Sequence, residues 1–162
     1  MFEIHKNFID EEHFEVLEKV MMGNDFPWFY NKAITQENNN KRFQFVHTFY
    51  NDCTWTSNHY QILGPIINKL KIFTLKRIKA NLITKTAQHD QANLHIDYDK
   101  CTTAIYYVNT NNGYTIFENG EKIDCIANSI VIFDSDYKHA SVSQTDTNTR
   151  VVINFNFVKN EN

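Results

Sequence analysis

Short apolar segments of alternating pattern, separated by Asn, Asp and Gly, follow one another from about residue 72 to the end of the chain. In the first segment Ile78, Ala80 and Leu82 fall on one side of an extended chain. The other side carries Arg77, Lys79, Asn81 and Ile83. Such segments are typical of antiparallel hairpins that close into a sandwich or a small barrel. The later segments are TTAIYYVN, YTIFENG, KIDCI, SIVIFD, ASVSQTD and RVVINFNFV.

The front of the chain predicts a helix over about residues 10–22. Phe14, Leu17 and Met21 recur at the spacing of one helix face, and glutamates lie around the opposite surface. Asp10 suits the N-cap position because its carboxylate can accept from a free backbone N–H. Since helices come first and strands later, we expect the helices to pack on the outer face of a sheet.

A second helix is predicted over about residues 57–70, with Ser57 as its N-cap. Gly64 and Pro65 should kink or restart this helix, because proline has no backbone N–H to donate. Between the two helices, two aromatic segments are interpreted as strands, separated by a polar loop around Gln36 to Asn40. These segments are FPWFY and KRFQFVHTFY.

The last segment predicts which face of the sheet the helices cover. Every second residue from Val151 to Phe157 is apolar, and this unbroken face should meet the helices. The alternate face carries Arg150 and should point into the barrel. A cation directed inward is costly unless an anion meets it. A dicarboxylate co-substrate would do so, and a neighbouring Asp or Glu is the structural alternative.

Composition limits the classes of partner. The 162 residues, 42% of them hydrophobic, are enough for one domain with a sizeable core. A formal charge of −3 and a pI near 6.1 give no electrostatic reason to expect nucleic acid or an anionic membrane as partner. No signal peptide is recognisable, and no apolar run approaches the ~20 residues that span a bilayer. We expect a cytoplasmic protein whose Cys53, Cys101 and Cys125 are reduced thiols.

Three side chains, His95, Asp97 and His139, have the chemistry of a transition-metal site. His95 and Asp97 are two positions apart, so both fall on one face of an extended chain. His139 follows Asp97 by 42 positions, so an adjacent strand has to deliver it. Two imidazoles and a carboxylate match the facial triad of non-heme Fe(II) oxygenases, which leaves coordination positions open for substrate and O2. For each histidine alone, a hydrogen-bonded structural role is the alternative.

Together with the segments around them, these three residues form a sequence pattern that resembles the Fe(II)/2-oxoglutarate-dependent dioxygenase superfamily, specifically its prolyl-4-hydroxylase-like branch. The similar stretch covers roughly residues 77–157, about half of the chain. The His-x-Asp of LHIDYD is followed by IYYVN, by a turn with glycine and by SIVIFDSD. His139 comes next, and Arg150 stands eleven positions further on.

This resemblance implies a mainly β fold with N-terminal helices. The single domain would cover residues 1–162, with helical support over about 1–75. Its core over about 76–158 would be a double-stranded β-helix, or jelly roll, with the helices packed on the outer face of the major sheet.

The resemblance also implies the cofactors. His95, Asp97 and His139 would hold Fe(II), and 2-oxoglutarate would chelate the metal through its 1-carboxylate and 2-keto oxygen. The far carboxylate would lie against Arg150, whose planar guanidinium suits a bidentate pair. Tyr107 matches the family tyrosine that hydrogen-bonds the same carboxylate. Asn81 stands in a segment where many relatives have another tyrosine, and ascorbate is a candidate reductant.

The function implied is oxidation of a peptidyl, amino-acid or other small substrate by O2, by default hydroxylation, with release of succinate and CO2. Asp97 argues against halogenation, because halogenases lack this carboxylate. A non-catalytic jelly-roll module that binds a metal or ligand is one alternative. A nucleic-acid demethylase is another, although such relatives carry a second arginine where this chain has Asn156. Substrate identity and oligomeric state are left open.

Overall fold

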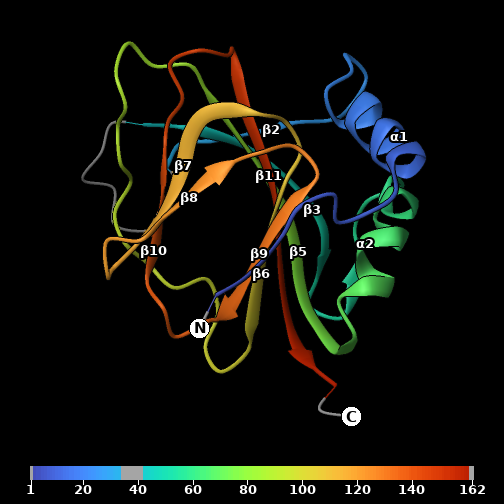
Figure 1. The fold of residues 1–162 in the computed structure, drawn as a ribbon. Helices are drawn as coiled ribbons and strands as arrows, with labels where there is room; N and C mark the ends of the chain where they lie inside the picture. The colour runs from blue at the N-terminus through green and yellow to red at the C-terminus, as the bar shows by residue number, and fades with distance from the viewer. Residues whose placement is uncertain (1, 34–41, 161–162) are drawn as a thin grey trace.

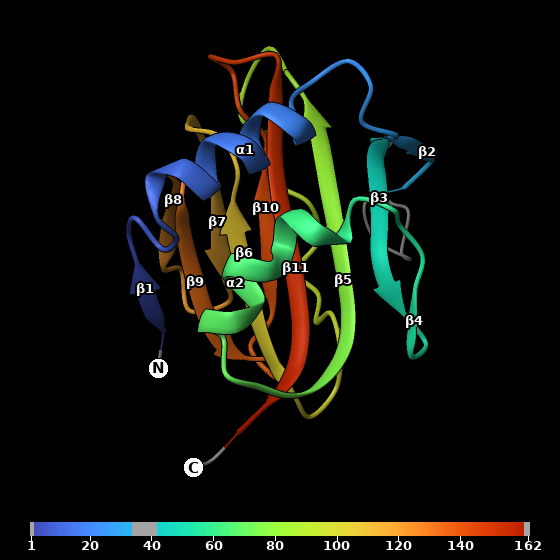
Figure 2. The ribbon, with the colours of Figure 1, turned by 90° about the vertical axis from the view of Figure 1, so that its right-hand side faces the viewer.

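The computed structural model describes residues 2–33 and 42–160 and consists of two antiparallel β-sheets with two helices on one side (Figure 1). Figure 2 shows both helices on the outer face of the larger sheet. The predicted fold class, a mainly β jelly roll with helices on the major sheet, is confirmed. The polar loop predicted around residues 36–40 lies outside the described residues.

Among the described residues, the larger sheet contains eight strands. Its central strands, β11 and β5, pair over eleven register positions from Thr149↔Thr84 to Lys159↔Ile72. The order across the sheet is β1 (Glu3–His5), β9 (Ser129–Asp134), β6 (Thr102–Tyr107), β11 (Thr149–Lys159), β5 (Ile72–Thr84), β3 (Gln44–Asn51) and β2 (Phe29–Asn31), with β4 (Thr54–Trp55) paired to β3.

The smaller sheet has the order β10 (His139–Val142), β7 (Asn111–Phe117) and β8 (Lys122–Cys125). The chain between β5 and β6 runs along its β10 edge, through isolated bridges Gln91↔Val142 and His95↔His139. From β5 onward the chain crosses repeatedly between the two sheets, apart from the hairpin β7–β8 within the smaller one, which is the winding of a jelly roll. The space between the sheets is where inward side chains of β5, β6, β7 and β11 meet.

Helix α1 (Glu11–Met21) agrees with the predicted helix. Asp10 is its N-cap, and the Asp10 carboxylate accepts from the backbone N–H of His13 at 3.2 Å. Phe14, Leu17 and Met21 are its buried residues. They share one core cluster with the outward face of β11, confirming that the apolar face of the last strand meets the helices: Val151, Ile153, Phe155 and Phe157.

The second predicted helix is shorter than expected. A 3₁₀ turn, η1 (Tyr60–Leu63), leads at Gly64 into α2 (Gly64–Lys69), so the restart expected at Gly64 and Pro65 is confirmed. The N-cap assigned to Ser57 is wrong. Its hydroxyl lies 2.7 Å from Nε2 of His47 and accepts from the backbone N–H of His59, which fixes a turn before the helix instead.

Residues 1–75, predicted as helical support, also contribute strands to the larger sheet. The aromatic segments do form strands, β2 and β3, and β3 pairs with β5. Strand β1 was missed because its three side chains are all exposed. It has no apolar alternation, and its place is set by backbone pairing with β9.

Removing the buried part of α1 should cost stability. Leu17 is fully buried, so Leu17→Ala is expected to lower the free energy of unfolding by about 2–5 kcal/mol. Val16 is 53% exposed on the same helix, and Val16→Ala should change it by less than about 0.5 kcal/mol. Urea denaturation of both variants checks this, and equal losses would contradict the packing of α1 on the sheet.

Candidate metal centre and anion pocket

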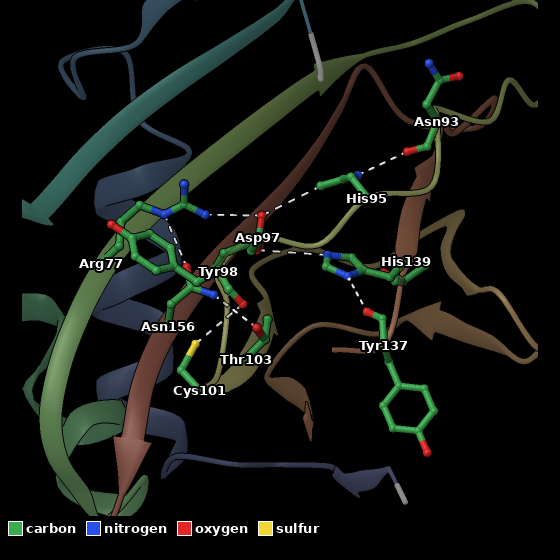
Figure 3. A network of polar contacts seen from close by, with 12 residues as sticks. Arg77, Asn93, His95, Asp97, Tyr98, Cys101, Thr103, Tyr137, His139 and Asn156 are labelled. Carbon is green, nitrogen blue, oxygen red and sulfur yellow. Dashed lines mark hydrogen bonds and ion pairs between the residues drawn. The ribbon is translucent and has the colours of Figure 1, made fainter. Parts of the chain in front are cut away.

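A backbone bridge brings the two histidines together. The N–H of His95 donates to the carbonyl of His139, and the N–H of His139 donates to the carbonyl of His95, each at 3.0 Å. His139 is the first residue of β10, so the adjacent strand delivers it as the spacing predicted. Asp97 follows His95 by two positions and points to the same side (Figure 3).

The three side chains form one compact group. Nε2 of His95 lies 3.7 Å from Oδ1 of Asp97, and Nε2 of His139 lies 3.9 Å from Oδ2. All three candidate ligand atoms lie within 4.8 Å of one another. Ligands at ~2.1 Å from one metal at right angles stand ~3 Å apart, so small side-chain rotations bring this set to bonding distance.

Backbone carbonyls set which ring nitrogen of each histidine faces the group. Nδ1 of His95 lies 3.1 Å from the carbonyl of Asn93, and Nδ1 of His139 lies 3.5 Å from that of Tyr137 (Figure 3). A carbonyl can only accept, so Nδ1 carries the proton in both rings. Nε2 of each ring then faces the group with Asp97 and is the nitrogen available to a metal ion, which is the arrangement that metal-binding histidines use.

Asp97 is held from two sides. Arg77 of β5 forms an ion pair with its Oδ1 at 3.1 Å, and the amide of Asn154 of β11 donates to its Oδ2 at 3.0 Å. Asn156 accepts from Nε of Arg77 at 3.2 Å and donates to Thr103 at 3.0 Å, which fixes the guanidinium in turn. The alternation in the sequence put Asn154 and Asn156 on the inward face with Arg150, but none of these side chains was predicted to belong to the metal site.

Burial and neighbouring charges shift the pKa values of the group. Burial would raise the pKa of Asp97, but the interactions with His95, His139 and Arg77 outweigh it and hold that pKa well below its usual range. Burial lowers the pKa of His139, against the pull of the Asp97 charge. Burial also works to lower the pKa of His95, but its contact with Asp97 prevails and raises it. Asp97 is therefore an anion, and His139 presents a neutral ring at neutral pH.

Arg150 lies at the other end of the same pocket, and 1% of it is exposed. One guanidinium nitrogen donates to Oγ1 of Thr115 at 3.2 Å, while its Nε is buried without a hydrogen-bond partner. Within residues 2–33 and 42–160, no carboxylate forms an ion pair with Arg150. The structural alternative, in which a neighbouring Asp or Glu neutralises Arg150, is therefore not found among these residues. A buried cation in this state fits an anionic ligand.

Thr115 on β7 is a further candidate that the sequence analysis missed. Its Oγ1 accepts from Arg150 and also from the hydroxyl of Tyr107 at 2.9 Å. A threonine hydroxyl has two lone pairs and one hydrogen, so its own hydrogen has to point elsewhere, and Thr115 lines the pocket. Tyr107 is fully buried and reaches the pocket through Thr115 rather than lining it.

The pocket between the sheets joins the metal group to Arg150. Three cationic side chains line it, those of Arg77, Lys79 and Arg150, but only one carboxylate does, that of Asp97. Asn81, the candidate on β5, also lines it. Three buried polar atoms along the lining have no hydrogen-bond partner among the described residues: Ser141 Oγ, Arg150 Nε and Asn154 Oδ1. Such atoms call for a polar ligand, because an unmet buried polar group is costly.

Gly113 lets β7 approach Arg150 closely. A Cβ at this position would lie 3.0 Å from Cδ of Arg150 and 2.9 Å from the carbonyl oxygen of Val142. Gly113→Ala is therefore expected to displace both and to lower the free energy of unfolding by about 1–3 kcal/mol. At Gly64 an added Cβ meets nothing within 4 Å, so Gly64→Ala should be neutral or slightly stabilising. Chemical denaturation of the pair checks the contrast, and a neutral Gly113→Ala would refute the close approach.

Comparisons with known proteins identify the fold. No protein-family model matches the chain, and no curated protein matches it. A 2OG-Fe(II) oxygenase family protein from Burkholderia pseudomallei has a similar structure, with TM-score 0.74 and 9% identity over 98% of this chain and 85% of that one. A prolyl hydroxylase from Trichoplax adhaerens, in complex with a peptide fragment of hypoxia inducible factor, gives TM-score 0.65 and 17% identity, covering 96% and 83%.

A third similar structure carries ligands. The epimerase SnoN, in complex with Fe³⁺, α-ketoglutarate and nogalamycin RO, gives TM-score 0.68 and 8% identity over 98% of this chain and 78% of SnoN. The chain therefore has the double-stranded β-helix fold of the 2-oxoglutarate/Fe(II) oxygenases. In the part of the chain that the structure describes, no helix is long and apolar enough to cross a membrane.

The residues present fit an Fe(II) ion and a dicarboxylate. Two imidazole lone pairs and one carboxylate would form an N2O donor set, which suits iron. The cation at Arg150, with the unsatisfied polar atoms near it, fits the far end of a five-carbon diacid. The candidate metal ligands and the groups that could bind an anion line a single pocket.

Proposed function

We propose that this protein is an Fe(II)- and 2-oxoglutarate-dependent dioxygenase that hydroxylates a peptidyl, amino-acid or other small substrate and belongs to the prolyl-4-hydroxylase-like branch. The observation that supports it most is one pocket with a His-Asp-His group at one end and a buried, unneutralised Arg150 at the other. The similar fold of the Trichoplax prolyl hydroxylase and the motif order from His95 to Arg150 support the branch.

The chain's own residues would bind and orient the reactants. His95, Asp97 and His139 would hold iron from one side, and Arg77 and Asn154 would keep the Asp97 carboxylate aimed at it. Arg150 and Thr115 would hold the far carboxylate of 2-oxoglutarate, with Tyr107 steadying Thr115. Iron bound with 2-oxoglutarate would supply the activation of O2: one oxygen atom would enter succinate as 2-oxoglutarate loses CO2, and the other would be available to the substrate.

Succinate formation tests the proposal without a known substrate. Purified protein with Fe(II), ascorbate and 2-oxoglutarate should slowly release succinate, and omission of iron or addition of a chelator should abolish this. Fe(II) and 2-oxoglutarate should each raise the melting temperature, because ligands that bind only the folded state stabilise it. Absence of turnover together with a metal-dependent thermal shift would favour the non-catalytic binding module instead.

Loss of the Thr115 hydroxyl should weaken co-substrate binding. Thr115→Val is nearly isosteric but leaves the hydroxyl of Tyr107 and one Arg150 nitrogen without their acceptor. We expect the KM for 2-oxoglutarate to rise about 10-fold, since such a loss costs about 1–3 kcal/mol. Thr115→Ser keeps the hydroxyl and should stay within about threefold of wild type. Equal KM values for the two variants would exclude a role for this hydroxyl.

A further inference from the structure

Lys79 is a second pocket cation without a counter-ion. It lies on β5 between Arg77 and Asn81, is partly buried and lines the pocket. Among the residues that the structure describes, its ammonium group has neither a hydrogen bond nor an ion pair. Burial and the Arg77 charge lower the pKa of Lys79, and the Asp97 charge works against them. An anion close to the amine would favour its charged form.

The nearby carboxylate of Asp97 acts on Lys79 through its charge but forms no ion pair with it among the described residues. Both oxygens of Asp97 are engaged, one by Arg77 and the other by the amide of Asn154. Asn154 lies directly opposite Lys79 in the ladder of β5 and β11, yet its Oδ1 is buried without a partner. Two opposing ladder positions therefore carry a donor, the ammonium group of Lys79, and an acceptor, Oδ1 of Asn154, and neither has a hydrogen-bond partner among the described residues.

The position of Lys79 separates it from the far end of the co-substrate. Arg150 pairs with Ile83 across the ladder, whereas Lys79 stands four residues further along β5. At 3.3–3.4 Å per residue this separates the two backbone positions by about 13 Å along the strand. Lys79 is instead level with Asn154, the residue that contacts Asp97.

Charge balance indicates what Lys79 would meet. Arg77, Lys79 and Arg150 outnumber the single lining carboxylate, and Fe(II) with the 2-oxoglutarate dianion would add no net charge. A surplus of positive charge would remain in a confined space, where an unpaired charge is costly. Resting on the function proposed above, we propose that the substrate carries an anionic group, a carboxylate or a phosphate, which pairs with Lys79.

Fractionation of a cell extract of small molecules and peptides tests this inference. The extract is split by anion exchange, and each fraction is added to the assay of iron-dependent succinate formation. The retained, anionic fraction should stimulate turnover at least about fivefold. Phosphatase treatment of that fraction separates the two chemistries, because stimulation by a phosphate compound is lost and stimulation by a carboxylate survives.

Variants connect the stimulation to Lys79. Lys79→Gln should raise the half-saturating amount of the retained fraction at least about tenfold and shift the KM for 2-oxoglutarate far less. Lys79→Arg, which keeps the charge, should retain most of the stimulation. Lys76→Gln is the matched control, since Lys76 is an exposed lysine on the same strand. Calorimetric binding of the retained fraction to protein loaded with Zn(II) and 2-oxoglutarate should follow the same order.

The outcomes keep the two proposals apart. Three outcomes would overturn the inference: stimulation by the unretained fraction, stimulation by no fraction, or an undiminished response in Lys79→Gln. Basal succinate formation in the same assay would still support the dioxygenase. A KM for 2-oxoglutarate that rises as much as the half-saturating amount would also overturn it, because Lys79 would then serve the co-substrate. Absence of iron-dependent succinate formation would reject the proposed function itself.

Discussion

His139→Ala is expected to lower iron-dependent succinate formation by more than about 100-fold. Loss of a residue that only orients a ligand costs 10–100-fold in metal affinity or activity, and loss of a ligand should cost more. Fe(II) should no longer raise the melting temperature of this variant, because the remaining His95 and Asp97 bind the ion too weakly. Turnover and thermal shift, measured over a range of Fe(II) concentrations, check this expectation.

A histidine elsewhere provides the control for His139. His5 is exposed on β1, and His5→Ala should keep both turnover and the iron-dependent thermal shift. His139 is buried, so His139→Ala also has to be shown to fold, by its circular dichroism and its metal-free melting curve. A folded His139→Ala that binds iron and turns over normally would remove His139 from the metal centre.

Arg150→Met should raise the KM for 2-oxoglutarate by about 100-fold. Truncating one partner of a buried charge pair costs about 2–5 kcal/mol, which corresponds to roughly 30-fold or more in affinity. Arg150→Lys should fall between this variant and wild type, because an ammonium group keeps the charge but not the planar pair of donors. Initial rates over a range of 2-oxoglutarate concentrations measure the effect.

The stability of Arg150→Met separates binding from folding. In the ligand-free protein the guanidinium is buried without an anion among the described residues, so its removal should leave the melting temperature unchanged or raise it. The rise in melting temperature on addition of 2-oxoglutarate should disappear in the same variant. A strongly destabilised Arg150→Met with an unaltered response to 2-oxoglutarate would instead make Arg150 a structural residue.

Alternation along single strands was the most dependable information in the sequence. It separated the two faces of β11 and the two faces of β5, because a strand buried on both sides still places successive side chains oppositely. The same reasoning put His95 and Asp97 on one side. It failed for β1 and for the start of the second helix, where pairing with β9 and the hydroxyl contacts of Ser57 decide the structure.

The sequence by itself determined the elements, the helix-covered face of the major sheet and the residue types that could hold a metal. Only the tertiary structure decided which inward side chains meet. Arg77 and Asn154 reach Asp97, and Thr115 joins Arg150 to Tyr107, through contacts that span 20, 57, 35 and 8 positions in the chain. The alternation along a strand predicts the face of the sheet to which a side chain points. The partner that it finds depends on the register between strands, which the packing of the whole domain sets.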